Sequence, residues 1–134
     1  MSNGQDEAEI RGVIERWATA VQARDLDGVV ACHSENMVMF DVPRPSELRG
    51  IGAYKASWPP FFKWQRDHDG VFEIVSLDVT AGAETAYAHG LLICASRREQ
   101  PVHPDAYLRL TVGLIKQGGR WQIAHEHHSF AAET

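Results

Sequence analysis

The chain has 134 residues, of which 44% are hydrophobic and 23% are charged, and its formal net charge at pH 7 is -5. This length suits one domain with one hydrophobic core, and the composition excludes disordered and fibrous proteins. The acidic balance, without any clustered run of Lys and Arg, argues against a nucleic-acid or anionic-membrane surface. We therefore expect a single domain over residues 1–134 that binds neither nucleic acid nor membrane.

The N-terminal sequence and the cysteines bear on the compartment. No stretch approaches the roughly 20 apolar residues that span a bilayer, and Asp6, Glu7 and Glu9 stand where a signal peptide would be basic. Cys32 and Cys94 lie far apart and in no metal-ligand spacing, which favours two reduced, buried thiols over a disulfide. These features predict a cytoplasmic protein.

The first part of the chain is predicted to be mainly helical. Within residues 6–24, apolar side chains recur at the spacing of one helical face, with polar side chains on the other. Asp25 is suited to cap a second, short helix that ends near His33. A strand is then predicted over Met37–Val42, where two nearby prolines stop it.

A third helical segment is predicted from Gly50, with a break or restart at Pro59 and Pro60. After it the pattern changes to four strands joined by turns: Val71–Thr80, Thr85–Arg97, Ala106–Lys116 and Arg120–Ser129. Strands this long must bend to pack against so few helices, and Gly90 and Gly113 are the expected bend or bulge points. We expect an α+β fold: a cone-shaped, curved antiparallel sheet wrapped around the N-terminal helices, enclosing one pocket.

Two segments carry a family resemblance. Residues 16–30, followed by Met37–Asp41, resemble the bacterial ketosteroid isomerases and the SnoaL-like polyketide cyclases. Residues 119–129, with Gly-Arg-Trp at the start and His-x-His-x-Ser at the end, look like the last strand of the wider nuclear-transport-factor-like superfamily, which includes the association domains of calmodulin-dependent kinases. The resemblance implies this fold over nearly the whole chain, and a homodimer.

The resemblance also bears on residue roles. In the isomerases an Asp at the end of the first strand abstracts a proton, and the resemblance places that role on Asp41. The Tyr that donates a hydrogen bond to the developing oxyanion falls on Trp17, and the second donor, a protonated Asp, has no match in Leu110–Leu114. Because losing one oxyanion donor typically costs about 2.7–4 kcal/mol in the transition state, we do not expect classical steroid isomerisation.

Asp41 is the main candidate for catalysis. It stands between Phe40 and Val42 at a strand end, in surroundings of low dielectric that suit a general base. The alternative is a loop carboxylate that caps the following proline turn. His89 is expected either to face the pocket as an acid–base partner of Asp41 or to face outward at an interface.

His125 and His127 lie two residues apart on a strand and so share one face of the sheet. Such a pair can chelate a metal when a third ligand approaches, but the resemblance favours a polar role, and we expect neither metal nor cofactor. His127 is a further candidate assistant to Asp41, and His125 a candidate pocket residue. Four aromatic residues are predicted to line the pocket or the core beside it, which favours a small apolar or aromatic ligand: Trp17, Tyr54, Trp58 and Phe62.

The third long strand predicts an interface. Its alternating Leu108, Leu110 and Val112 are expected to face the pocket, which leaves a mixed set on the convex face: Tyr107, Arg109, Thr111 and Ile115. Aromatic, Arg and aliphatic residues together are typical of interface cores. We therefore expect a homodimer through the convex sheet face.

Two functions are consistent with these residues. The first is a cofactor-free isomerase, cyclase or lyase that acts on an apolar carbonyl-type substrate, with Asp41 as general base and His89 or His127 assisting. The second is a non-catalytic ligand-binding or dimeric assembly domain of the same fold. The missing oxyanion donors, and the ending shared with kinase association domains, favour this alternative.

Overall fold

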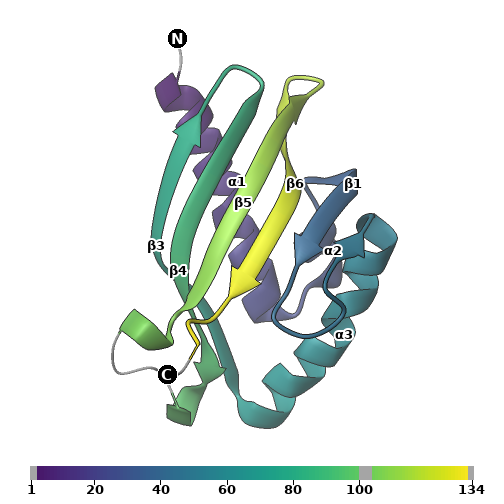
Figure 1. Ribbon diagram of the computed structural model, residues 1–134, viewed down its shortest axis with the longest axis vertical. Coiled ribbons are helices and arrows are strands. Elements are labelled where there is room, and N and C mark those ends of the chain that lie inside the picture. The colour runs from purple at the N-terminus through teal and green to yellow at the C-terminus, as the bar shows by residue number, and fades with distance from the viewer. Residues whose placement is uncertain (1–2, 100–103, 133–134) are drawn as a thin grey trace.

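The computed structural model describes residues 3–99 and 104–132 (Figure 1). Its helices are α1 (Asn3–Ala23), α2 (Leu26–Val30) and α3 (Ile51–His68), and two short 3-10 helices cover Arg97–Glu99 and Pro104–Ala106. Its strands are β1 (His33–Phe40), β2 (Leu48–Arg49), β3 (Gly70–Ala81), β4 (Thr85–Ser96), β5 (Leu108–Gln117) and β6 (Arg120–Ser129). No helix in the described ranges is long and apolar enough to cross a membrane.

The strands form one curved sheet in the order β2-β1-β6-β5-β4-β3. Every neighbouring pair is antiparallel except β1 and β6, which run parallel. Figure 1 shows α1 lying across one face of the long strands, while α3 runs from beside β1 to the start of β3. The α+β class and the curved sheet around an N-terminal helix are therefore confirmed.

The N-terminal helices form where the pattern predicts them. The apolar stripe of α1 is buried against the sheet, from Ile10 at its start to Val21 near its end. The Asp25 carboxylate caps α2 by accepting a hydrogen bond from the Gly28 N–H at 3.1 Å. β1 begins at His33, earlier than predicted, because its backbone pairs with β6 although the residues that follow are polar.

The predicted break at Pro59 and Pro60 is wrong, because α3 continues through both residues. The two prolines lie on the exposed side of the helix, while Tyr54, Trp58 and Phe62 recur every four residues on its buried side. A proline inside a helix costs about 3 kcal/mol or more, and burial of three large aromatic side chains offsets that cost.

The two strand glycines mark irregularities, as predicted. The register of β3 and β4 shifts beside Gly90, where a Cβ atom would lie 2.3 Å from the backbone oxygen of Ser76. A second shift follows Gly113, which pairs with His125 while the next residue of β5 pairs with Ile123. Ala124 is therefore the extra residue of a bulge in β6. A bulge of this kind changes which alternate side chains of its strand face the core.

The facing predicted for β5 is confirmed by burial. Leu108, Leu110 and Val112 are buried on the inner face, whereas Arg109 and Thr111 are exposed on the outer face.

Both cysteines are free. Cys94 is half-buried in β4, but Cys32 is exposed, so the expectation of a buried thiol is wrong for Cys32. Cys32 lies in the turn between α2 and β1, with a positive φ of 60°.

Candidate functional site

A cavity of about 330 Å³ lies between α3, the inner face of the sheet and the segment that follows β1. It is more enclosed than the hollows lined by α1 and the one beside the proline turn that follows β1. Its lining is mainly apolar and consists of Asp41, Val42, Pro43, Ser57, Trp58, Pro60, Phe61, Phe72, Cys94, Leu108, His128 and Phe130. This volume is at the low end of ordinary ligand pockets, so the cavity suits a small molecule.

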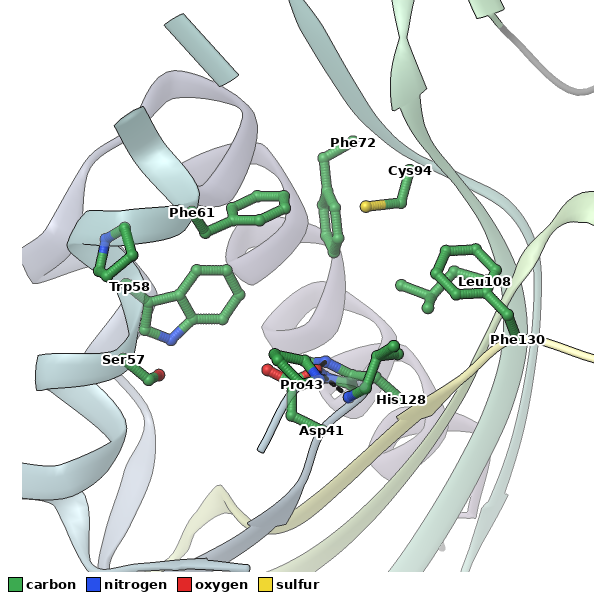
Figure 2. Close-up of a pocket in the computed structure, with 12 residues that line it drawn as sticks. Asp41, Pro43, Ser57, Trp58, Phe61, Phe72, Cys94, Leu108, His128 and Phe130 are labelled. Carbon is green, nitrogen blue, oxygen red and sulfur yellow. Dashed lines mark hydrogen bonds and ion pairs between the residues drawn. The ribbon is translucent and has the colours of Figure 1, made fainter. Parts of the chain in front are cut away.

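Aromatic rings form one side of the cavity (Figure 2). Trp58 and Phe61 project from α3 and meet edge to face, with ring centroids 5.6 Å apart, and Phe61 meets Phe72 of β3 in the same way at 5.9 Å. Trp17 supports this wall through edge contacts with Trp58 and Phe72. Rings held edge to face keep fixed orientations, so the wall is suited to a flat apolar ligand.

Asp41 and His128 lie beside each other on the opposite side of the cavity (Figure 2). Asp41 directly follows β1, and its Oδ1 accepts a hydrogen bond from the Val42 N–H at 2.8 Å and lies 3.3 Å from His128 Nδ1. Its side chain is 27% exposed, and Oδ2 has no hydrogen-bond partner among residues 3–99 and 104–132. Oδ2 is therefore the oxygen that remains available to a ligand.

His128 is held between two carboxylates. Its Nδ1 faces Asp41, and its Nε2 lies 3.0 Å from Oε1 of Glu126. Because carboxylate oxygens accept, both ring nitrogens donate and the ring is an imidazolium. Burial lowers the pKa of His128, but the hydrogen bonds and charges of Asp41 and Glu126 outweigh burial and raise it to about 9.

Glu126 is fully buried beneath the cavity. Besides His128, it contacts His33 Nε2 at 2.5 Å and accepts a hydrogen bond from the Tyr54 hydroxyl at 2.7 Å, both through Oε2. Burial raises the pKa of Glu126, but the two histidines outweigh burial and lower it to about 2. Glu126 is thus a buried anion that stabilises the positive charge on His128.

Trp17 completes this network away from the cavity. Its Nε1 donates to the Tyr54 hydroxyl oxygen at 2.8 Å, and Tyr54 in turn donates to Glu126. Burial and the nearby Glu126 charge raise the pKa of Tyr54 well above its usual value. The Trp17 N–H, which the sequence resemblance matches to the donor position of the isomerases, is therefore already used inside the protein.

The structure brings together only some of the predicted site residues. Asp41 and Trp58 line the cavity. Tyr54 and Trp17 support it from behind, and Phe62 is buried in the core next to Trp58.

The predicted histidine partners of Asp41 need correction. The side chain of His89 is 60% exposed on the outer face of β4, where its Nδ1 lies 4.0 Å from Asp78 Oδ2. Of the two orientations expected for His89, the structure therefore has the outward one. His127 is exposed on the outer face of β6. His125 is half-buried on that face, and its Nδ1 contacts the Val38 carbonyl oxygen at 2.7 Å. None of the three reaches the cavity.

Three polar residues of the site do not figure among the predicted ones: His33, Glu126 and His128. The alternation of β6 does pair His125 with His127 on one face and Glu126 with His128 on the other. The bulge at Ala124 turns the second pair inward, after Ile123 has already faced the core. The signal for the site was thus present in the sequence, but the location of the bulge was needed to interpret it.

Cys94 is the one thiol on the cavity wall within the described ranges. Burial, and secondarily the Asp41 charge, raises the pKa of Cys94 to about 12. Because the thiolate is the reactive form, this raised pKa argues against Cys94 as a nucleophile.

Comparisons with known proteins place the chain in a family. The sequence profile of the SnoaL-like domain matches residues 10–133. A solved NTF2-like protein of unknown function from Pseudomonas putida KT2440 is 36% identical, with a TM-score of 0.84 over 96% of this chain and 89% of that one. No curated protein sequence matches the chain.

More distant structures share the fold. A candidate ketosteroid isomerase from Shewanella frigidimarina is 18% identical, with a TM-score of 0.69 over 88% of this chain and 92% of that one. A candidate aromatic ring hydroxylase from Novosphingobium aromaticivorans is 14% identical, with a TM-score of 0.75 over 99% of this chain and 94% of that one. The profile match and the Pseudomonas relative carry the assignment: the chain belongs to the SnoaL-like family of NTF2-like proteins.

Proposed function

We propose that this protein is an isomerase or lyase in which Asp41 acts as general base on a small apolar substrate in the cavity. The observation that carries the proposal is the contact between Asp41 and His128, two charged side chains that line the same largely apolar cavity. Charged groups that converge in an apolar pocket are the usual sign of acid–base chemistry. Acid–base chemistry of this kind requires no cofactor.

In the proposed step, Oδ2 of Asp41 takes a proton from the substrate, and the electron pair of the broken bond stays on the substrate. Return of the same proton to another atom completes an isomerisation. His128 does not take the proton, because both of its nitrogens already donate to carboxylates. It is a positioning residue that orients Asp41 and offsets its charge, and Glu126 keeps it in place.

The fold shared with the candidate ketosteroid isomerase from Shewanella frigidimarina agrees with this proposal. That fold hosts more than one function, so the site residues and not the fold carry the argument.

A second candidate is a ligand-binding protein without turnover. One observation favours it: the N–H groups of Trp17 and His128, which could stabilise a developing oxyanion, are engaged inside the protein. An enzyme that builds up negative charge on its substrate normally keeps such donors free.

Hydrogen exchange separates the two candidates. The protein would be incubated in D2O with 1-tetralone and with 2-hydroxy-1-tetralone, and deuterium uptake next to the carbonyl would be followed by NMR. General-base catalysis typically contributes about 10²- to 10⁴-fold, so Asp41→Asn should lower the exchange rate by at least about 100-fold.

The matched control is Asp78→Asn, which makes the same change on the exposed outer face of β3. It should leave the exchange rate unchanged. Binding of these ketones without any exchange above buffer would contradict catalysis and support the ligand-binding alternative.

A further inference from the structure

The polar atoms around the cavity are unequally available to a ligand. Val42 donates its N–H to Asp41, and His128 donates from both nitrogens to carboxylates. Ser57 donates its hydroxyl hydrogen to the Tyr54 carbonyl at 2.6 Å. These donors are all used within the protein.

Two further donors belong to the wall, and neither is well suited to a ligand. Trp58 Nε1 is buried without a hydrogen-bond partner in the described part of the chain, but the nitrogen itself is covered by neighbouring atoms. A ligand oxygen would have to displace the indole to reach it. The thiol of Cys94 is a weak donor.

Among the side chains of the lining residues that the structure describes, the accessible polar atoms that remain are acceptors. They are Oδ2 of Asp41 and the lone pairs of the Ser57 hydroxyl. The lining is otherwise apolar and aromatic. A ligand can satisfy Asp41 only by bringing a hydrogen of its own.

We infer that the ligand is a flat apolar molecule that carries a neutral hydroxyl group, an alcohol or a phenol, and donates it to Oδ2 of Asp41. The inference rests on the proposed pocket, but it does not require turnover.

Other polar groups fit the same place less well. A bare carbonyl oxygen would face the Asp41 carboxylate without an accessible donor, and an anionic ligand would be repelled. A cationic amine would gain less than beside an isolated carboxylate, because the His128 imidazolium lies 3.3 Å from Asp41 and already offsets its charge. A neutral donor forms a charge-assisted hydrogen bond without adding net charge to an apolar cavity.

Three probes of similar size test the inference: 2-naphthol, 2-methoxynaphthalene, in which a methyl group replaces the donor hydrogen, and 2-naphthaldehyde. Their affinities would be measured by isothermal titration calorimetry at pH 6.5, with 2-naphthylmethylamine as the cationic comparison. A hydrogen bond to a charged group contributes about 1.5–3 kcal/mol, so 2-naphthol should bind at least about 10-fold more tightly than the other three probes.

Variants locate the contact. Asp41→Asn keeps an oxygen that accepts from His128 and turns an amide N–H toward the cavity. The order of affinities should therefore reverse, with 2-naphthaldehyde bound more tightly than 2-naphthol. Asp78→Asn is the matched surface control and should retain the wild-type order. Trp58→Phe should weaken all probes by a similar factor, because it alters the wall but not the accessible polar atom.

Several results would overturn the inference. For the wild type, they are equal affinities for 2-naphthol and 2-methoxynaphthalene, tightest binding of 2-naphthaldehyde or of the amine, and no binding of any probe. For Asp41→Asn, the contradicting result is an order of probe affinities that is unchanged from the wild type. If Trp58→Phe lost binding of 2-naphthaldehyde but kept binding of the other probes, the result would instead assign a ligand carbonyl to the indole N–H of Trp58. Tight 2-naphthol binding that depends on Asp41, together with no hydrogen exchange, would overturn the proposed catalysis and leave this inference standing.

Discussion

Glu126 and His128 lie two residues apart on β6, and their side chains form a direct hydrogen bond of 3.0 Å on the inner face of the sheet. His128 reaches the cavity, whereas Glu126 is fully buried beneath it. Strand periodicity places both side chains on one face, so a short segment supplies a buried anion and the cation that it stabilises. The charge state of the cavity wall therefore depends on a residue that the ligand cannot touch.

Replacing Glu126 by Gln should lower the pKa of His128, because the anion that favours the imidazolium is lost. It should also destabilise the fold by about 3 kcal/mol or more, the usual cost of breaking a buried ion pair. NMR titration of the His128 ring and urea unfolding measure the two effects. Glu73→Gln, the same change at an exposed position of β3, is the control. A His128 pKa that stays near 9 in Glu126→Gln would contradict the assigned role.

The stability of the protein should fall on both sides of a plateau in pH. The pKa of His128 rises from 6.5 to about 9 on folding, so its contribution is complete below pH 6.5 and is lost as the pH rises through 9. The pKa of Glu126 falls from 4.5 to about 2, so its contribution is complete above pH 4.5 and is lost as the pH falls toward 2. The plateau should lie between about pH 5 and 6.5.

The alkaline side gives the sharper test. Up to roughly 3 kcal/mol of unfolding free energy should disappear between pH 6.5 and 9, as the shift in the His128 pKa implies. Urea unfolding at a series of pH values measures it, and the slope should flatten in His128→Gln. A slope that is the same in the wild type and in His128→Gln would show that another group is responsible.

Much of the fold could be predicted from sequence periodicity. The stripe of α1 and the alternation of β5 each have one apolar face, and the structure buries both. The break predicted at the prolines of α3 is wrong because the low helix preference of proline is outweighed there. The buried aromatic face of α3 keeps the helix continuous. β1 starts early because backbone pairing, and not side-chain pattern, determines its first residues.

The site was less predictable, since it depends on a bulge. Asp41 could be found from its place at the end of a strand. His128 could not, because the inward face of β6 changes at Ala124, and neighbouring histidines of the same strand were equally good candidates. Only three-dimensional pairing distinguishes the histidine that meets Asp41 from those that face outward.

Two glycines should respond to alanine in opposite directions. At Gly90 the new Cβ would lie 2.3 Å from the Ser76 backbone oxygen, so the strands must move apart, and we expect a loss of about 1–3 kcal/mol. At Gly52, inside α3, nothing lies within 4 Å, and Ala should stabilise the helix by about 0.5–1 kcal/mol. Thermal and urea unfolding measure both variants. A neutral Gly90→Ala would contradict the close approach at the bulge.

The last prediction is a homodimer through the outer face of the sheet. Arg109 and Thr111 are exposed on this face, and Tyr87 beside them is 53% exposed. In the described part of the chain the helices cover the opposite face, so a second copy could bury these residues. A stable pair should bury more than roughly 1,200 Å² in total. Sedimentation velocity at micromolar concentration should therefore show a dimer.

Charge reversal on that face tests the geometry. Arg109→Glu should shift the protein toward monomer, because it places a carboxylate in the interface of both copies. Arg109 also donates to the Ser129 hydroxyl at 3.1 Å, so Thr111→Lys, which leaves that bond intact, is the second variant. Lys55→Glu makes the same charge change as Arg109→Glu on an exposed position of α3, and it should remain dimeric. A monomeric wild type, or a dimer that persists in both Arg109→Glu and Thr111→Lys, would contradict this interface.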